Sequence, residues 1–323
     1  MARSSAVSRL LRPVRTTLII ACVLQGISAV AGIAPFIAVV EIARVLLADE
    51  GSTAAITIAI VAAGALALRF VCMMAAGAMT HLADADLQLL IRRDIAARLR
   101  RVPLSWFTTQ TGGALKKAIQ DDVTALHEIV GHTFVNLTAA LVTPLTALAY
   151  LGWVDPLLIP VALILPVAGL TPYFLQMRGY GDKMTAFDAA QAEVNAAAVE
   201  YVQGIGVIKT FSGPDRAFSR FVERSEAFVT YFWNWIKDLL ALATATDLIL
   251  SPFAAIVAAG GLGLWLASMG WISPVAALAL VVMTPALTAP FLALGFAQNA
   301  MMQAKDAAKR IDALLDTPVL SAP

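Results

Sequence analysis

Long apolar stretches, separated by clusters of basic residues, constrain this sequence more than any other feature. Six stretches are long enough to cross the hydrocarbon core of a bilayer, which takes about 20 residues of helix. They lie at residues 18–40, 54–81, 129–151, 157–175, 239–267 and 272–296. The basic residues, apart from Arg44 and Arg69, gather in four clusters at 3–15, 92–117, 178–237 and 305–310. Because flanking positive charge tends to stay on the cytoplasmic side, the pattern predicts an all-α membrane protein with six transmembrane helices and both termini in the cytoplasm.

The composition excludes several other classes of protein. Only 14% of the residues are charged and 59% are hydrophobic, which leaves too little charge for the surface of a soluble domain. The formal net charge is +1 and membrane topology accounts for the basic residues, so we expect no nucleic-acid partner. Cys22 and Cys72 lie inside apolar stretches without a Cys or His at metal-binding spacing, which is typical of small core residues.

The connections between the stretches differ on the two sides of the membrane. The outer turns at Asp155-Pro156 and Ser273-Pro274 are short, and each places a capping side chain before a proline, as at the start of a helix. The cytoplasmic connections are long, and apolar residues recur at helical spacing in 82–107. At 1.5 Å per residue, a helix over 82–107 would reach roughly 35–40 Å beyond the bilayer. We therefore predict two cytoplasmic helical hairpins, which turn at 111–113 and 212–215, where Gly and Pro break helices.

Several segments resemble exporter-type ABC transporters. The first intracellular loop of that family is similar to 101–107, 112–115 and 121–123, the second to 200–211, and the end of the transmembrane domain to 307–318. The resemblance implies the ABC exporter type 1 transmembrane fold, with long cytoplasmic extensions and two coupling helices. It also implies an interfacial elbow helix at 1–16, the transmembrane domain at 17–316, and the start of a linker to a nucleotide-binding domain at 317–323.

The coupling helices of this family dock onto nucleotide-binding domains. By resemblance, the docking residues would be Thr111, Gly112, Gly113 and Leu115 in the first hairpin, and Lys209, Phe211, Gly213 and Arg216 in the second. The sequence has no G-x-x-x-x-G-K-[ST] phosphate loop, so we expect ATP and Mg on associated nucleotide-binding domains and no cofactor in this chain. The C-terminal segment resembles the linker of fused half-transporters, which favours an ATPase domain in the same polypeptide over a separate one.

A narrower resemblance concerns the cargo. Residues 35–44, 81–85, 113–117 and 125–132 are similar to exporter-fold half-transporters that import ferric siderophores, the mycobactin and yersiniabactin group. This resemblance implies uptake of an iron-loaded siderophore across a bacterial inner or plasma membrane by a heterodimer of two similar halves. Two alternatives remain open: an exporter of lipid, peptide or drug with the same fold, and an ATP-independent carrier or channel, against which the paired hairpins argue.

Polar residues inside the apolar stretches are candidates for the lining of a cargo cavity, because burying them in lipid is costly unless they pair or face a cavity. The candidates are Arg69, His81, His127, His132, Asn136, Asp247, Gln298 and Asn299. Glu41 and Arg44 lie three residues apart on one helix, and we expect them to pair with each other.

The three histidines also raise the question of a metal site. His127 and His132 are five residues apart, one more than in the zinc-protease motif, and on an α-helix they would point about 140° apart. An intramembrane protease is therefore not expected. His81 precedes Phe107 by 26 residues and His132 follows Lys116 by 16, or about 39 Å and 24 Å from the hairpin turn on straight helices. This mismatch favours separate histidines hydrogen-bonded along a hydrated cavity, with a metal site at His81, His127 and His132 as the alternative.

Overall fold

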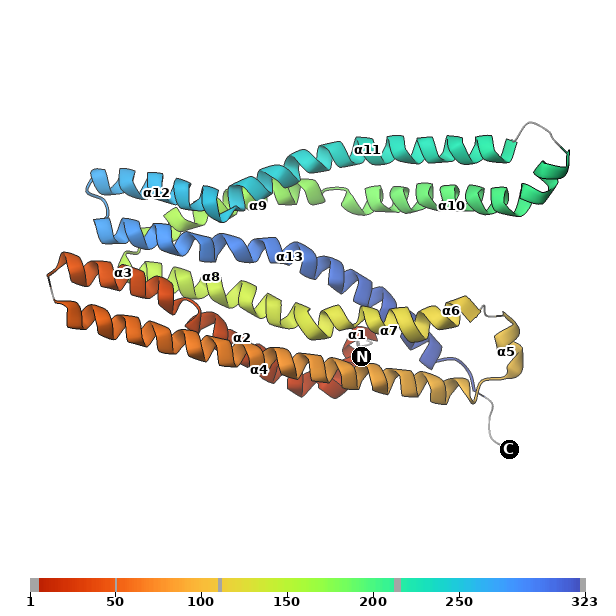
Figure 1. Ribbon diagram of the computed structural model, residues 1–323, viewed down its shortest axis with the longest axis horizontal. Helices are drawn as coiled ribbons and strands as arrows, with labels where there is room; N and C mark the ends of the chain where they lie inside the picture. Colours follow the sequence, from red (N-terminus) through yellow and green to blue (C-terminus); the bar gives the residue numbers. More distant parts are fainter. Residues whose placement is uncertain (1–5, 50, 110–111, 212–215, 320–323) are drawn as a thin grey trace, which may run out of the picture. The chain divides into compact units, whose positions relative to one another are not determined.

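The computed structural model describes residues 6–49, 51–109, 112–211 and 216–319, and every regular element in them is a helix (Figure 1). The elements are α1 Ala6–Leu10, η1 Arg12–Val14, α2 Arg15–Ala31, α3 Ala34–Leu47, α4 Ser52–Leu99, α5 Leu104–Thr109, α6 Gly112–Lys116, η2 Lys117–Asp122, α7 Val123–Ala125, η3 Glu128–Thr133, α8 Phe134–Val154, α9 Leu158–Met177, α10 Tyr180–Phe211, α11 Arg216–Leu250, α12 Pro252–Ser268 and α13 Pro274–Leu315. The element η1 is a 3-10 turn, whereas η2 and η3 are π-helical. The predicted all-α class is confirmed.

The helices bear out four of the six predicted membrane spans. Four helical segments are long and apolar enough to cross a membrane, namely Arg12–Leu47, Ser52–Leu99, Lys117–Val154 and Leu158–Met177. The helices Phe218–Leu250 and Pro252–Ser268 are long and apolar enough for a fifth span only when they are counted together. The two helices are separate because Ser251 caps α12 and Pro252 cannot continue α11. The sixth predicted stretch lies in α13, which begins with the shorter apolar segment Pro274–Thr288.

The chain divides into two compact units, and the larger one comprises residues 1–164 and 251–323. Within this unit α4 runs along α2 and α3, and α13 runs along α8 and α12 (Figure 1). One core joins α3, α8, α12 and α13 around residues such as Leu151, Leu280 and Met283. Gly263 permits a close approach in this core, because a Cβ atom there would lie 3.4 Å from the Cα atom of Ala277 on α13.

A second core of the larger unit lies at the end of α4 that leads into the first hairpin. Leu87, Ile91 and Ile95 on α4 pack with Leu126 and with Ile311 on α13, and all five are fully buried. The N-terminal segment packs against the same core, and Arg9 of α1 forms an ion pair with Asp312 of α13. The first hairpin and the end of α13 are therefore one packed body.

The smaller unit, residues 165–250, contains the second hairpin. The helices α10 and α11 run antiparallel and pack along each other (Figure 1). Phe187 of α10 contacts Phe228, Phe232 and Trp235 of α11, with ring centroids 5.3, 5.6 and 5.8 Å apart. The predicted turn at 212–215 lies outside the described residues.

The first hairpin differs from the sequence prediction. The predicted helix over 82–107 ends at Leu99, because residues 100–103 leave the helix and Pro103 precedes a separate helix, α5. The extension beyond residue 81 is therefore about 27 Å rather than 39 Å. The ascending arm begins at Gly112, so that Gly112 and Gly113 lie in α6, while Thr111 lies outside the described residues.

The short outer turns agree with the prediction. The N–H of Leu157 donates to Asp155 Oδ1 at 2.9 Å between α8 and α9. The hydroxyl of Ser273 accepts the N–H of Ala276 at 3.1 Å and so caps α13. Both proline turns lie where the sequence places them.

Candidate functional site

The three histidines lie together in one cluster, so their predicted separation is wrong. His81 comes from α4, His127 immediately precedes η3, and His132 lies within it. One possible ligand atom from each imidazole lies within 4.8 Å of the other two. The ring centroids are 5.0 to 5.5 Å apart.

The ends of the helices explain the first part of the error. The descending arm ends at Leu99, 18 residues after His81, and the ascending arm begins at Gly112, 20 residues before His132. At 1.5 Å per residue these arms are about 27 Å and 30 Å long. The two histidines therefore lie at nearly the same height in the hairpin.

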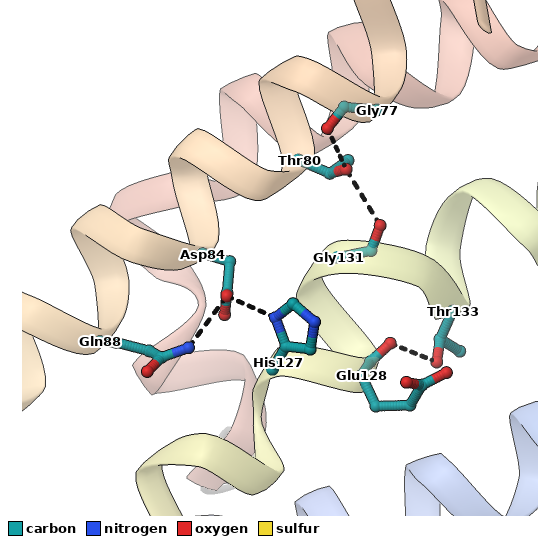
Figure 2. Close-up of polar contacts among 8 residues, drawn as sticks. All are labelled: Gly77, Thr80, Asp84, Gln88, His127, Glu128, Gly131 and Thr133. Atoms are coloured by element: carbon teal, nitrogen blue, oxygen red, sulfur yellow. Dashed lines mark hydrogen bonds and ion pairs between the residues drawn. The ribbon is translucent and has the colours of Figure 1, made fainter. Parts of the chain in front are cut away.

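The π-helical segment Glu128–Thr133 explains the second part. In a π-helix each N–H bonds to the carbonyl five residues back, so residues five apart lie one turn above each other, as residues four apart do in an α-helix. The hydroxyl of Thr133 donates to the carbonyl of Glu128 at 2.9 Å over this same spacing (Figure 2). His127 and His132 can therefore face one side, which the 140° of a regular α-helix would forbid.

Gly131 lies against the imidazole rings. A Cβ atom at this position would lie 3.4 Å from Cε1 of His127 and 3.6 Å from Cε1 of His81. The carbonyl of Gly131 accepts a hydrogen bond at 3.0 Å from the hydroxyl of Thr80, a fully buried residue next to His81 (Figure 2). This bond ties the π segment to α4 at the cluster.

A buried carboxylate supports the cluster. Asp84 lies one turn after His81 on α4 and is only 4% exposed. Its Oδ2 atom lies 2.6 Å from Nδ1 of His127 and accepts a hydrogen bond from the amide of Gln88 at 2.9 Å (Figure 2). The sequence analysis did not select Asp84, although its spacing of three residues from His81 puts both on one face of a helix.

Three imidazoles can hold a divalent transition metal. Imidazole nitrogen suits Zn²⁺, and bonds of 2.0–2.1 Å in a tetrahedral site place the ligand nitrogens about 3.3 Å apart. To reach this geometry, ligand nitrogens that are now up to 4.8 Å apart would have to approach one another by up to about 1.5 Å. Three protein ligands would leave a fourth tetrahedral position for water or another ligand.

The other predicted lining residues are spread over the chain. Arg69 lies twelve residues before His81 on α4, about 18 Å along the helix, and its guanidinium lies against Gly32 at the break between α2 and α3. Asn136 lies exposed on α8, one turn after His132, and Asp247 lies exposed on α11 in the smaller unit. The side chains of Gln298 and Asn299 lie outside the described residues. Of the predicted lining, the structure brings together the three histidines.

Comparison with known proteins identifies the family. Residues 18–291 match the family described as ABC transporter transmembrane region.

The chain belongs to this family. It is thus a multi-pass membrane protein.

The chain is also similar to individual members of the family. The chain is 29% identical, over 97% of its length, to the "Mycobactin import ATP-binding/permease protein IrtA" of Mycolicibacterium smegmatis. It is 31% identical, over 80% of its length, to the protein of the same name from Mycobacterium tuberculosis. It is also 26% identical, over 71% of its length, to the "Fatty acid ABC transporter ATP-binding/permease protein" of Mycobacterium bovis. The chain covers 36%, 30% and 36% of these relatives, so it spans about a third of their length.

The ends of the two hairpins contain the residues that the sequence analysis predicts to dock a nucleotide-binding domain. Gly112, Gly113 and Leu115 lie in α6, and the backbones of Lys209 and Phe211 end α10. Arg216 begins α11. Thr111 and Gly213 lie outside the described residues. The side chains of Lys209, Phe211 and Arg216 also lie outside them. Their role in docking a nucleotide-binding domain stays a prediction.

An ion pair that the sequence analysis missed joins the first hairpin to the end of this ABC transmembrane domain. Arg310 of α13 donates from Nε and Nη2 to the two carboxylate oxygens of Asp122, at 2.8 and 2.7 Å. Asp122 is 3% exposed, and its hydrogen bonds raise the pKa of the Arg310 guanidinium. Nearby, Nε of Arg98 donates to the carbonyl of Thr317 at 2.8 Å. Charged groups therefore hold the C-terminal end of α13 against the first hairpin.

The predicted pairing of Glu41 with Arg44 is confirmed. Nη1 of Arg44 lies 3.3 Å from Oε2 of Glu41. The hydroxyl of Tyr150 on α8 also donates to Oε1 of Glu41 at 2.8 Å. Glu41 therefore links Arg44 on the same helix to Tyr150 on α8.

Proposed function

We propose that this chain is the transmembrane domain of one half of an ATP-driven importer of iron-loaded siderophores. The observation that carries the proposal is the similarity to mycobactin import proteins, which extends over 97% of the chain. The fold is compatible with this function, since it supplies both an apolar membrane domain and cytoplasmic hairpins long enough to reach a nucleotide-binding domain.

The proposed transporter is a heterodimer in a bacterial inner membrane, with the termini of this chain in the cytoplasm. Binding of ATP and Mg²⁺ by its nucleotide-binding domains would draw the two halves together, and hydrolysis would release them. The extended helices carry such rigid-body movement from the cytoplasm to the membrane. Cargo shifts the balance between inward-open and outward-open states only by binding one of them better.

Within this transporter we assign the histidine cluster to a divalent metal ion and the other polar residues to cargo. His81 ends the second predicted apolar stretch, so the cluster would lie at the cytoplasmic edge of the membrane. Arg69 and Asn136 would donate hydrogen bonds to the oxygen-rich surface of a ferric siderophore. A metal ion held by α4 and η3 would cross-link the two arms of the first hairpin, on the cytoplasmic side of the proposed cargo site.

A lipid carrier is the second candidate function, because one relative is named for fatty acid transport. This similarity covers 71% of the chain at 26% identity, less than the similarity to the mycobactin proteins. The same fold is compatible with both functions, so a measurement of which cargo is transported must decide between them.

The test is uptake of radioactive iron presented on a mycobactin-type siderophore. The assay compares cells deleted for the gene with cells that carry the intact gene or a variant inactive in the ATPase domain. Loss of uptake in the deletion strain, restored by the intact gene alone, is the expected result. Unchanged iron uptake combined with altered transport of a labelled fatty acid would replace the siderophore proposal by the lipid carrier.

A further inference from the structure

Asp84 is a buried carboxylate that contacts one of the three imidazoles, that of His127. Burying an ionised carboxylate is costly unless it is hydrogen-bonded or paired. In the described part of the chain, Asp84 has two such partners, Nδ1 of His127 and Nε2 of Gln88, and both contact Oδ2. The other oxygen, Oδ1, is buried without a hydrogen-bond partner. Asp84 therefore makes no other connection between helices that would explain its place in the core.

The contact determines the tautomer of His127. When Asp84 is ionised, its oxygen can only accept, so the contact of 2.6 Å places a proton on Nδ1 of His127. The lone pair of a neutral His127 then lies on Nε2, the atom on the far side of the ring, which is the one left for a metal. Gln88 holds the carboxylate from the other side, so that Asp84 cannot turn away from the ring (Figure 2).

Charge balance supports the same assignment. Three neutral imidazoles bring no negative charge to a divalent cation, whereas a carboxylate hydrogen-bonded to one of them makes that ring a stronger donor. No hydrogen bond is present at the rings of His81 and His132 within the described residues. Asp84 thus gives the cluster the orientation and the negative charge that its ligands lack.

We propose that Asp84 is the positioning residue of a metal site at His81, His127 and His132. It holds His127 with Nε2 directed to the metal and partly neutralises the cation without binding it. This proposal rests on the metal site put forward above, but it does not depend on the identity of the cargo.

The test measures zinc affinity in the intact transporter, purified in nanodiscs, by competition with a chromophoric chelator. We expect Asp84→Ala to bind Zn²⁺ about 10–100-fold more weakly than the unchanged protein. Asp84→Asn keeps the shape and removes the charge, so its affinity should lie between the two, and Asp84→Glu should recover part of the loss. The matched control is Asp86→Ala, which removes an exposed carboxylate two residues away on the same helix and should leave the affinity unchanged.

Two further measurements separate positioning from a structural role. The visible spectrum of bound Co²⁺ reports the ligand geometry, and Asp84→Ala should alter its position and intensity. The melting temperature without metal should differ little between Asp84→Asn and the unchanged protein, whereas the stabilisation gained on adding Zn²⁺ should shrink. A lower metal-free melting temperature with unaltered zinc affinity would overturn the proposal in favour of a structural ion pair.

The remaining outcomes distinguish this proposal from those on which it rests. Zinc binding that persists unchanged in Asp84→Ala but is lost in His127→Ala would overturn the role of Asp84 and leave the metal site standing. Absence of zinc binding in the unchanged protein would overturn both. Neither result bears on siderophore uptake, which the radioactive iron assay decides separately.

Discussion

Replacing Arg310 by Met should destabilise the contact between the first hairpin and α13, because it leaves the carboxylate of Asp122 buried without a counter-charge. Both oxygens of Asp122, which is 3% exposed, accept hydrogen bonds from Arg310. Removing one partner of a buried ion pair costs about 3–5 kcal/mol. The side chain of Arg310 is 48% exposed, so water already reaches its end of the pair. We therefore take about half of this cost, roughly 2 kcal/mol.

The assay is thermal unfolding of the reconstituted transporter, followed by tryptophan fluorescence. At roughly 2 °C per kcal/mol for a large domain, the melting temperature should fall by about 4 °C. The matched control is Lys309→Met, which removes the neighbouring cation from a pair with Asp306 whose side chains are 73% and 61% exposed. That change should stay within about 0.5 kcal/mol of the unchanged protein.

A double substitution tests the physical reason for the effect. If the cost arises from an unpaired buried charge, Asp122→Asn combined with Arg310→Met should be more stable than Arg310→Met alone, because no charge is left buried. The reasoning is refuted if the double variant is as unstable as the sum of the two single variants. It is refuted equally if Lys309→Met is as destabilising as Arg310→Met.

Two further substitutions test the outer part of the domain by the same thermal assay. Ser273→Ala should lower the free energy of unfolding by about 1 kcal/mol, because it removes the N-terminal cap of α13. The control Ser268→Ala removes a hydroxyl that bonds to a carbonyl of its own helix, and it should change the free energy of unfolding by no more than about 0.5 kcal/mol. Gly263→Val should cost about 1–3 kcal/mol by forcing α12 away from α13. Gly261→Val, two residues earlier and facing open space, should cost clearly less, and equal melting temperatures for the two valine variants would contradict the close-packing argument.

The features that could be predicted from the sequence are those that depend on neighbouring residues. Apolar stretches gave the spans, because hydrophobicity is a local property. The caps at Asp155 and Ser273 gave the outer turns, since a side chain that bonds a nearby N–H needs no distant partner. The pair Glu41 and Arg44 belongs to the same class, because residues three apart on a helix always adjoin.

The histidine cluster could not be predicted, because it depends on where two distant helices end. The assumption that the descending arm continues to Phe107 displaced His81 by eight residues, about 12 Å. No residue type marks a π turn, so the prediction assumed an α-helix, in which His127 and His132 point in different directions. In the structure the π turn brings them together. The geometry of the hairpin, rather than its composition, decides the site.

The buried acids were missed for a related reason. Asp122 and Arg310 are 188 residues apart, so no spacing along the chain relates them. Asp84 differs from the exposed Asp86 only in the face of α4 on which it lies. Which face is inside follows from the packing of α4 against η3, and this packing is not visible in one helix alone.

The π-helical turn at Glu128–Thr133 has a consequence for changes in chain length. It contains one residue more than an α-helical turn between the same two points. Deleting one residue between His127 and His132 would allow an α-helical turn there, and the two histidines would then lie four apart, still on one face. The deletion would leave α8 beyond it in place, because the lost residue is the one that the wider turn accommodates. A chain shortened by one residue at this point should therefore keep its histidine cluster, whereas the same deletion within the regular turns of α4 would rotate one side of the hairpin relative to the other.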